Sequence, residues 1–111
     1  DARSPERFLG ISEEPRAGMK SGHIPNSKNL YFNDLVDPGT KKFIKKEEIG
    51  DLIKKVGIDI NKDIVCSCGS GVTACILKFA LELLEENKNI KIYDGSWSEW
   101  GTKEDSPCEK N

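Results

Sequence analysis

No stretch of the chain approaches the roughly 18 consecutive apolar residues of a membrane-spanning helix, so the sequence predicts no contact with a membrane. The chain also lacks internal repeats and long blocks of like charge. Its 17 Lys and Arg residues are interleaved with 19 Asp and Glu residues, for a net charge of −2. This mixture is typical of a solvated surface and does not favour nucleic acid as a partner. We therefore expect one domain of 111 residues around a single hydrophobic core.

The cysteines lack the spacings that would indicate a metal site or a disulfide framework. None of the four forms the Cys-x2-Cys pair that is common in zinc sites. Three of them, Cys66, Cys68 and Cys75, crowd one short stretch, unlike the dispersed cysteines of a small secreted protein. The sequence therefore predicts no metal and no cofactor. It favours a reducing compartment, cytoplasmic or mitochondrial, in which one cysteine is reactive.

Short-range patterns predict alternating strands and helices. Asp63–Val65 has the apolar character of the end of a buried strand, and Ala74–Glu86 has apolar residues at helical spacing. Another helix ends at Gly57, and an apolar strand follows at Ile90–Tyr93. This alternation predicts a three-layer α/β/α domain with a mainly parallel sheet. We also expect a strand at Ser27–Leu30, a helical turn at Phe32–Val36 and an exposed loop at Ile11–Met19.

The stretch Cys66–Thr73, between the first predicted strand and its helix, combines thiols, glycines and hydroxyl groups. Cys68 would lie where the loop meets the helix N-terminus, whose unpaired N–H groups favour a negative charge and lower a cysteine pKa. Gly69 and Gly71 allow several N–H groups to converge on one point. The sequence therefore predicts a nucleophilic thiolate at Cys68.

One residue type is missing from this loop. A cysteine phosphatase carries Cys-x5-Arg, in which the guanidinium grips phosphate through two hydrogen bonds. The sixth residue after Cys68 is Ala74. Hydrolysis of phosphate esters would lack its main clamp, so this reaction is not expected.

The block Cys68–Thr73, with the sequence Cys-Gly-Ser-Gly-Val-Thr, resembles the active-site loop of the rhodanese superfamily, and within it the 3-mercaptopyruvate sulfurtransferases. Gly22–Pro25 and Asp94–Trp100 resemble two further phrases of this family in the same order, and the histidine of the first, His23, is expected to be structural. The resemblance implies a rhodanese-like domain over residues 1–111. It further implies a C-terminal catalytic domain whose partner, an N-terminal rhodanese-like domain, is absent from this chain. Because Asp1–Arg3 resembles the end of the family's first strand, most of that strand is expected to be missing.

The resemblance also assigns roles around Cys68. Arg7 and Arg16 are expected to converge on its sulfur and to orient a 2-keto carboxylate, which suits their rigid donor forks. Ser70 matches a catalytic serine that acts with a histidine and an aspartate of the other domain. Cys66 either resolves an oxidised or persulfidated Cys68 or is simply a buried strand residue. The expected substrate-binding residues are Arg7, Arg16, Gly69, Gly71, Val72, Thr73 and Trp97, with core packing as the alternative for Trp97.

The implied activity is a sulfurtransferase. It would move sulfur from 3-mercaptopyruvate, through a Cys68 persulfide, to an acceptor such as thioredoxin, a small thiol or cyanide. One alternative is a thiosulfate:cyanide sulfurtransferase, although such family members tend to carry cationic residues where this chain has Gly69 and Ser70. The other alternative is a sulfur-carrier or binding domain that does not turn over small donors.

Overall fold

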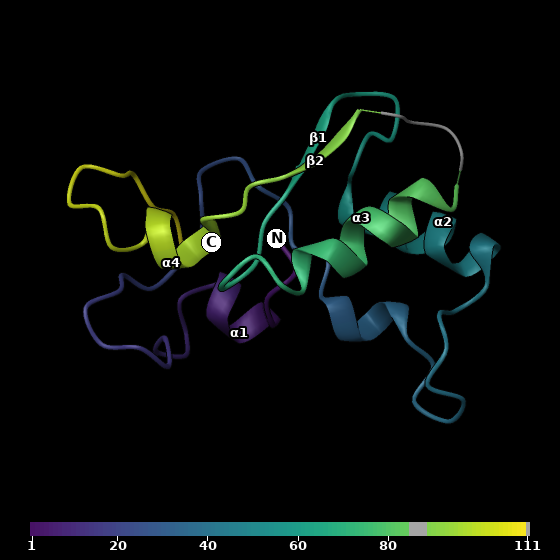
Figure 1. Ribbon diagram of the computed structural model, residues 1–111, viewed down its shortest axis with the longest axis horizontal. Coiled ribbons are helices and arrows are strands. Elements are labelled where there is room, and N and C mark those ends of the chain that lie inside the picture. The colour runs from purple at the N-terminus through teal and green to yellow at the C-terminus, as the bar shows by residue number, and fades with distance from the viewer. Residues whose placement is uncertain (85–88, 111) are drawn as a thin grey trace.

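Two short parallel strands, β1 (Ile64–Cys66) and β2 (Ile90–Ile92), form the sheet of the computed structural model, which describes residues 1–84 and 89–110 (Figure 1). The helix α3 (Ala74–Glu82) lies between them in the chain, as parallel strands require, because a tight turn cannot bring two parallel strands side by side. The predicted α/β class with a parallel sheet is confirmed. The other elements are α1 (Pro5–Phe8), the 3-10 helix η1 (Phe32–Leu35), α2 (Lys46–Val56) and α4 (Ser96–Trp100).

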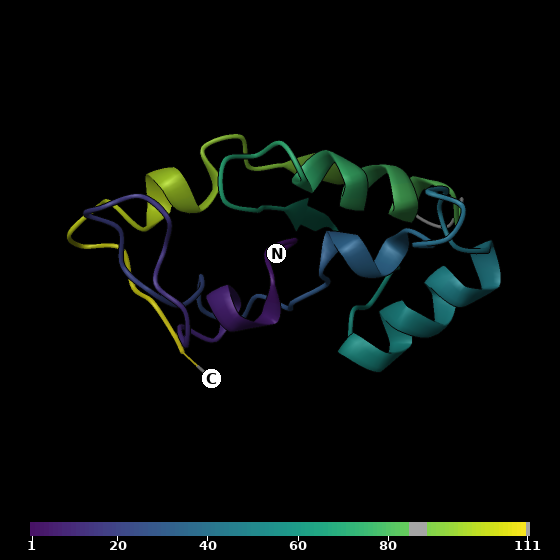
Figure 2. The same cartoon turned by 90° about the horizontal axis from the view of Figure 1, so that it is seen from below.

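The helices form two groups on opposite sides of the molecule, and strand β1 lies between the two groups. Figure 2 shows α3 and α4 along one side of the molecule and α1, η1 and α2 along the other. Helix α3 packs on both strands and on η1, because its apolar residues recur at helical spacing and share one face. Both groups contribute to one core. Its buried members include Leu30, Leu35, Ile49, Ile53, Cys66, Leu77, Ala80, Leu81 and Ile90.

Local sequence patterns located most of these elements. Helix α2 carries acidic residues in its first turn and ends at Gly57, whose φ of +80° lies in the left-handed region, as predicted. The helical turn predicted at Phe32–Val36 is η1. Helix α3 begins at Ala74 as expected but stops at Glu82, while residues 85 and 86 of the predicted helix lie outside the described part of the chain. Within that part, no helix is both long and apolar enough to cross a membrane.

The strand predicted at Ser27–Leu30 is not formed. The backbone of this segment is instead hydrogen-bonded to Asp1 at the N-terminus. The Asp1 amine donates to the Lys28 carbonyl at 2.8 Å, and the Leu30 N–H donates to the Asp1 carbonyl at 2.9 Å. The Ala2 N–H in turn donates to the Ser67 carbonyl, at 2.8 Å, just beyond β1. Asp1 and Ala2 therefore lie between β1 and Ser27–Leu30, and they are too few to build a ladder between them.

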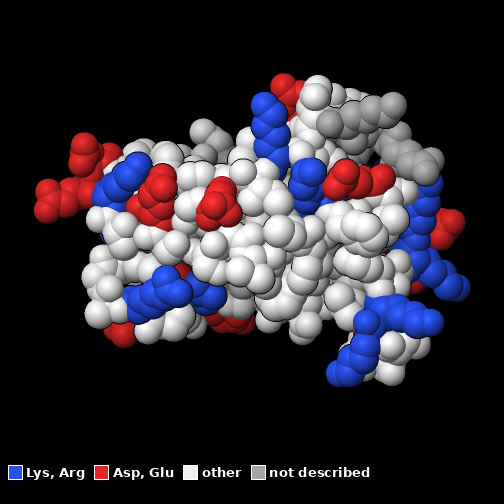
Figure 3. All heavy atoms as spheres, in the orientation of Figure 1, with Lys and Arg blue, Asp and Glu red and all other residues white. Residues whose placement is uncertain are grey.

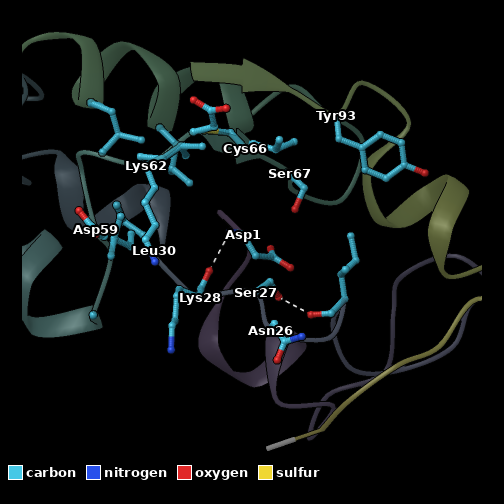
Figure 4. Close-up of a pocket in the computed structure, with 18 residues that line it drawn as sticks. Asp1, Asn26, Ser27, Lys28, Leu30, Asp59, Lys62, Cys66, Ser67 and Tyr93 are labelled. Atoms are coloured by element: carbon cyan, nitrogen blue, oxygen red, sulfur yellow. Dashed lines mark hydrogen bonds between the residues drawn. The ribbon is translucent and has the colours of Figure 1, made fainter. Parts of the chain in front are cut away.

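A trough of about 490 Å³ opens beside this junction (Figure 4). Cys66 and Ser67 line one side, Asn26, Ser27, Lys28 and Leu30 line the other, and Asp1 lies between them. The exposed strand residue Val65 also borders the trough. Among the described residues, the sheet contains only β1 and β2, so the edge of β1 that faces the trough carries no further strand.

Candidate active site

The loop that follows β1 turns back sharply before α3 begins. Gly71 is buried with φ of +96°, and a Cβ atom placed on it would lie 2.6 Å from the Asp94 carbonyl oxygen. Only glycine fits both the backbone conformation and this close approach. The turn aims the Gly71 N–H at the Cys68 sulfur, at a distance of 2.9 Å.

Several donors converge on the same sulfur. Burial by itself would raise the pKa of the Cys68 thiol. Hydrogen bonds to the sulfur outweigh burial and hold the pKa below its ordinary value. The donors are the Thr73 hydroxyl and the backbone N–H groups of Ala74, Gly71 and Ser70. The site therefore stabilises a thiolate, as the sequence predicts for Cys68.

The backbone of the loop is held from behind by the segment that starts α4. The Cys68 N–H donates to the Ser96 hydroxyl at 3.0 Å, and the Cys68 carbonyl accepts from the Trp97 N–H at 2.9 Å. The Ser98 N–H donates to the Gly69 carbonyl at 2.8 Å. Ser96 is fully buried and has φ of +50°, a conformation that is uncommon for a residue with a side chain. These bonds fix the loop backbone at Cys68 and Gly69.

A network of charged residues lies in front of the loop. Glu14 accepts two hydrogen bonds from Arg7, at 2.6 Å from Nη2 and 3.0 Å from Nε. It also lies 3.4 Å from Nη1 of Arg3, which is 2% exposed and is bonded to Asp1. A Cβ atom at Gly69 would lie 2.8 Å from Arg7 Nη2, so the Arg7 guanidinium lies directly against the loop.

Burial lowers the pKa of Arg3 to about 10, which leaves it charged at neutral pH. For Arg7 the hydrogen bond to Glu14 is the largest influence, and it raises the pKa. Both guanidiniums therefore stay positive beside the Cys68 sulfur. Positive charges that line the same hollow as the sulfur favour a thiolate and would attract an anionic substrate.

Two hollows meet at the loop. The thiol hollow, of about 270 Å³, is lined by Cys68 and Thr73 and by two aromatic residues, Tyr31 and Phe32. The Arg16 hollow, of about 170 Å³, contains Arg16, Glu14, Met19 and Ser98. Arg7, Gly69 and Ser70 line both.

The structure brings most of the predicted site residues to these hollows. Cys68 is only 1% exposed, which is less than the open crevice expected from the sequence, yet it reaches the thiol hollow. Ser70 is exposed at the boundary of the two hollows. Val72 is 72% exposed and lines neither hollow. Trp97 also lines neither, because its buried ring packs on the Arg3 guanidinium at 4.5 Å, so the core-packing alternative describes it better.

Cys66 has the features of a buried strand residue. It is 1% exposed, and burial raises the pKa of its thiol to about 11. Cys66 lines the trough beside β1, whereas Cys68 lines the thiol hollow on the other side of the loop. A protonated thiol that opens onto a different cavity is a poor candidate for a resolving cysteine. Cys75, in the first turn of α3, is exposed.

His23 has a packing role. Its ring stacks on Phe8 with centroids 3.7 Å apart, and Nδ1 lies 2.7 Å from the Phe8 carbonyl oxygen. The other nitrogen faces Glu109 at 3.7 Å.

The described residues contain no group of His, Cys, Asp and Glu that could hold a metal ion. On the face drawn in Figure 3, charges of both signs surround a broad uncharged area.

The sequence analysis did not identify three residues that contribute to the candidate site. It did not select Arg3 or Glu14, which form the charged network, or Ser98, which holds the loop backbone. A charged residue directly after the apolar Ala2 was a weak signal for a buried Arg3. Glu14 gave none, because one glutamate in a polar loop has the same pattern as its exposed neighbour Glu13.

Comparisons with known proteins agree with this geometry. The family model described as the rhodanese-like domain matches residues 1–103. The chain is 45% identical to the thiosulfate/3-mercaptopyruvate sulfurtransferase 1, mitochondrial, of Arabidopsis thaliana, and 42% identical to the 3-mercaptopyruvate sulfurtransferase of Escherichia coli K12. Each match covers 98% of this chain, but only 28% of the first relative and 38% of the second.

A solved structure gives the same result for the fold. The crystal structure of the Tum1 protein from Saccharomyces cerevisiae superposes with a TM-score of 0.85 at 39% sequence identity. The superposition covers all of this chain and 39% of the yeast chain. A family model that spans most of the chain, close relatives and a matching fold lead to one conclusion: the chain belongs to the rhodanese family.

Proposed function

We propose that the chain carries the sulfur-accepting site of a 3-mercaptopyruvate sulfurtransferase, with Cys68 as its nucleophile. The observation that carries the proposal is the set of donors around the Cys68 sulfur, including the Gly71 N–H at 2.9 Å, with the Arg7 guanidinium against the same loop. Sulfur transfer from an anionic donor has two requirements. The nucleophilic sulfur must be ionised, and a cation must bind the donor. Both relatives named above carry 3-mercaptopyruvate sulfurtransferase in their names.

In the first step the Cys68 thiolate attacks the sulfur of 3-mercaptopyruvate. A sulfur–sulfur bond forms, the carbon–sulfur bond breaks, and its electron pair leaves on the enolate of pyruvate. The thiol proton of the donor passes to the enolate carbon, and the proposed relay is Ser70, which lines both hollows. Arg7 and Arg16 orient the carboxylate and ketone, and the loop donors then stabilise the Cys68 persulfide anion.

In the second step an acceptor thiolate attacks the outer sulfur of the persulfide. The acceptor becomes a persulfide, and Cys68 returns as a thiolate. Thioredoxin or a small thiol supplies the attacking thiolate, whereas cyanide attacks the outer sulfur through its carbon and leaves as thiocyanate. Because the two half-reactions share one covalent intermediate, ping-pong kinetics are expected.

Thiosulfate is the alternative donor. The name of the Arabidopsis relative includes both substrates. The loop positions Gly69 and Ser70 carry no charge, whereas a thiosulfate dianion would gain from extra cations there. This absence of charge favours 3-mercaptopyruvate as the better donor.

The domain proposal is that these residues form the C-terminal, catalytic rhodanese-like domain of a two-domain protein. It is supported by the extent of the matches, since the chain spans about 28–38% of the length of the relatives reported above. An N-terminal domain would cover the exposed Ser70 and complete the hollows. In its absence, the chain could accept sulfur without turnover, which is the sulfur-carrier alternative. Four free cysteines agree with a reducing compartment, cytoplasmic or mitochondrial.

The test is the intact mass of the protein after incubation with 3-mercaptopyruvate or thiosulfate. The wild type should gain the mass of one sulfur atom, and Cys68→Ser should gain none. Cys75→Ser, which removes an exposed thiol in the first turn of α3, is the control and should still gain it. A gain of sulfur by the Cys68→Ser protein would show that a residue other than Cys68 is the nucleophile. Labelling without release to a thiol would support the carrier alternative.

A further inference from the structure

Glu14 is a buried carboxylate to which neither the sequence patterns nor the mechanism above assigns a role. We infer that Glu14 is a positioning residue, which locks the Arg7 guanidinium against the Cys68 loop so that only its outer edge is offered to an anionic substrate. The inference rests on the proposed function for its substrate, but its geometry is independent of which donor is used.

The contacts of Glu14 are close and directional. Its side chain is only 1% exposed although it lies in the loop after α1. One carboxylate oxygen is 2.6 Å from Arg7 Nη2, and the other is 3.0 Å from Arg7 Nε. Two parallel bonds of this kind fix both the position and the plane of a guanidinium. On its other side the carboxylate is held by Arg3, which is itself buried.

This arrangement decides which Arg7 donors remain available. The Nε–Nη2 edge is occupied by Glu14, so the Nη1 group and the outer N–H of Nη2 are left for a substrate. Arg7 Nη2 lies against Gly69, which places this free edge at the boundary of the two hollows. A donor fixed before the substrate arrives does not lose side-chain entropy on binding.

A purely electrostatic role for Glu14 predicts the opposite behaviour. If Glu14 acted only through its charge, its removal would make the site more positive and would speed the reaction with anions. If Glu14 positions Arg7, its removal frees the guanidinium and slows the same reaction. The sign of the effect therefore separates the two roles.

The experiment compares Glu14→Gln, which removes the charge, with Glu14→Asp, which keeps the charge but is too short to span both Arg7 nitrogens. Glu13→Gln, an equal change at the exposed neighbouring residue, is the control. Glu14→Gln is also made on an Arg7→Ala background. Two readouts are used: kcat/KM for 3-mercaptopyruvate, and the ratio of Cys68 alkylation rates with iodoacetate and with neutral iodoacetamide.

We expect both Glu14 variants to lower kcat/KM about tenfold, mainly through KM, and to lower the alkylation ratio, because a mispositioned charged donor loses about that factor. Glu13→Gln should change neither readout. On the Arg7→Ala background, Glu14→Gln should have no further effect. A higher alkylation ratio in Glu14→Gln with a wild-type value in Glu14→Asp would overturn the inference, as would an undiminished effect without Arg7.

Two further outcomes are distinguishable. If both Glu14 variants fail to fold by tryptophan fluorescence, the role of Glu14 is structural and the inference is wrong. If the wild type takes no sulfur from 3-mercaptopyruvate but the alkylation ratios behave as described, the proposed function fails while the positioning of Arg7 by Glu14 stands.

Discussion

Replacing Thr73 by valine tests the central physical claim, that hydrogen bonds keep the Cys68 sulfur ionised in spite of its burial. Valine has nearly the shape of threonine but lacks the hydroxyl. That hydroxyl is the largest of the influences that lower the Cys68 pKa, ahead of the three backbone N–H groups. The substitution therefore removes one donor and leaves the rest of the loop in place.

The magnitude follows from the strength of a hydrogen bond to a charged group, roughly 1.5–3 kcal/mol. One pKa unit corresponds to about 1.4 kcal/mol, so the Cys68 pKa should rise by about one to two units. The lower end is more realistic, since the Gly71 N–H at 2.9 Å and its neighbours remain. Burial favours the neutral thiol in the wild type and in the variant, so the loss of this donor leaves fewer groups to oppose it.

The assay is the rate of Cys68 alkylation by iodoacetamide as a function of pH, followed by mass spectrometry. The midpoint for Thr73→Val should lie above that of the wild type. Thr40→Val is the matched control, because Thr40 lies in an exposed turn and its hydroxyl only accepts a bond from the Lys42 N–H. An unchanged midpoint in Thr73→Val would refute the reasoning.

The lowered Cys68 pKa should also make the free energy of unfolding depend on pH. The folded state lowers the Cys68 pKa, so ionisation of Cys68 stabilises the fold above the pKa of the unfolded thiol, about 8.5–9. This contribution is lost as the pH falls through the lower folded-state value. Thr73→Val should therefore reduce the free energy of unfolding more at about pH 9.5 than at about pH 5. An equal loss at both pH values would contradict the assignment of the effect to the thiolate.

Two further substitutions test the loop and its substrate. Gly71→Ala and Gly57→Ala both place a side chain at positive φ, which costs about 1–2 kcal/mol, but only the methyl group of Gly71→Ala would also meet the Asp94 carbonyl. That contact should add about 1–3 kcal/mol to the loss of stability in urea unfolding, and equal losses would show that the loop has room. Arg16→Ala should raise KM about tenfold for 3-mercaptopyruvate and less for thiosulfate. Equal effects on the two donors would argue against a carboxylate contact.

Several parts of the fold follow from residues that are close together in the sequence. Helix α2 is specified by its apolar spacing, its first-turn acids and Gly57, all within one short segment. The Cys68 loop is specified in the same way, because a strand, two glycines and a helix start are enough to gather N–H groups around one sulfur. The strand predicted at Ser27–Leu30 failed because a strand needs a partner, and partners are set by distant residues.

The sequence by itself determined the direction of the Cys68 pKa shift, because the groups that lower this pKa lie within six residues of Cys68. The tertiary structure alone decided what surrounds that sulfur. Glu14 meets Arg7, Ser96 meets Cys68, and Arg3 meets Trp97 only after loops without periodic patterns have taken their paths. Contacts between distant residues depend on the packing of the whole core, whereas the local conformation of a loop depends mainly on its own residues.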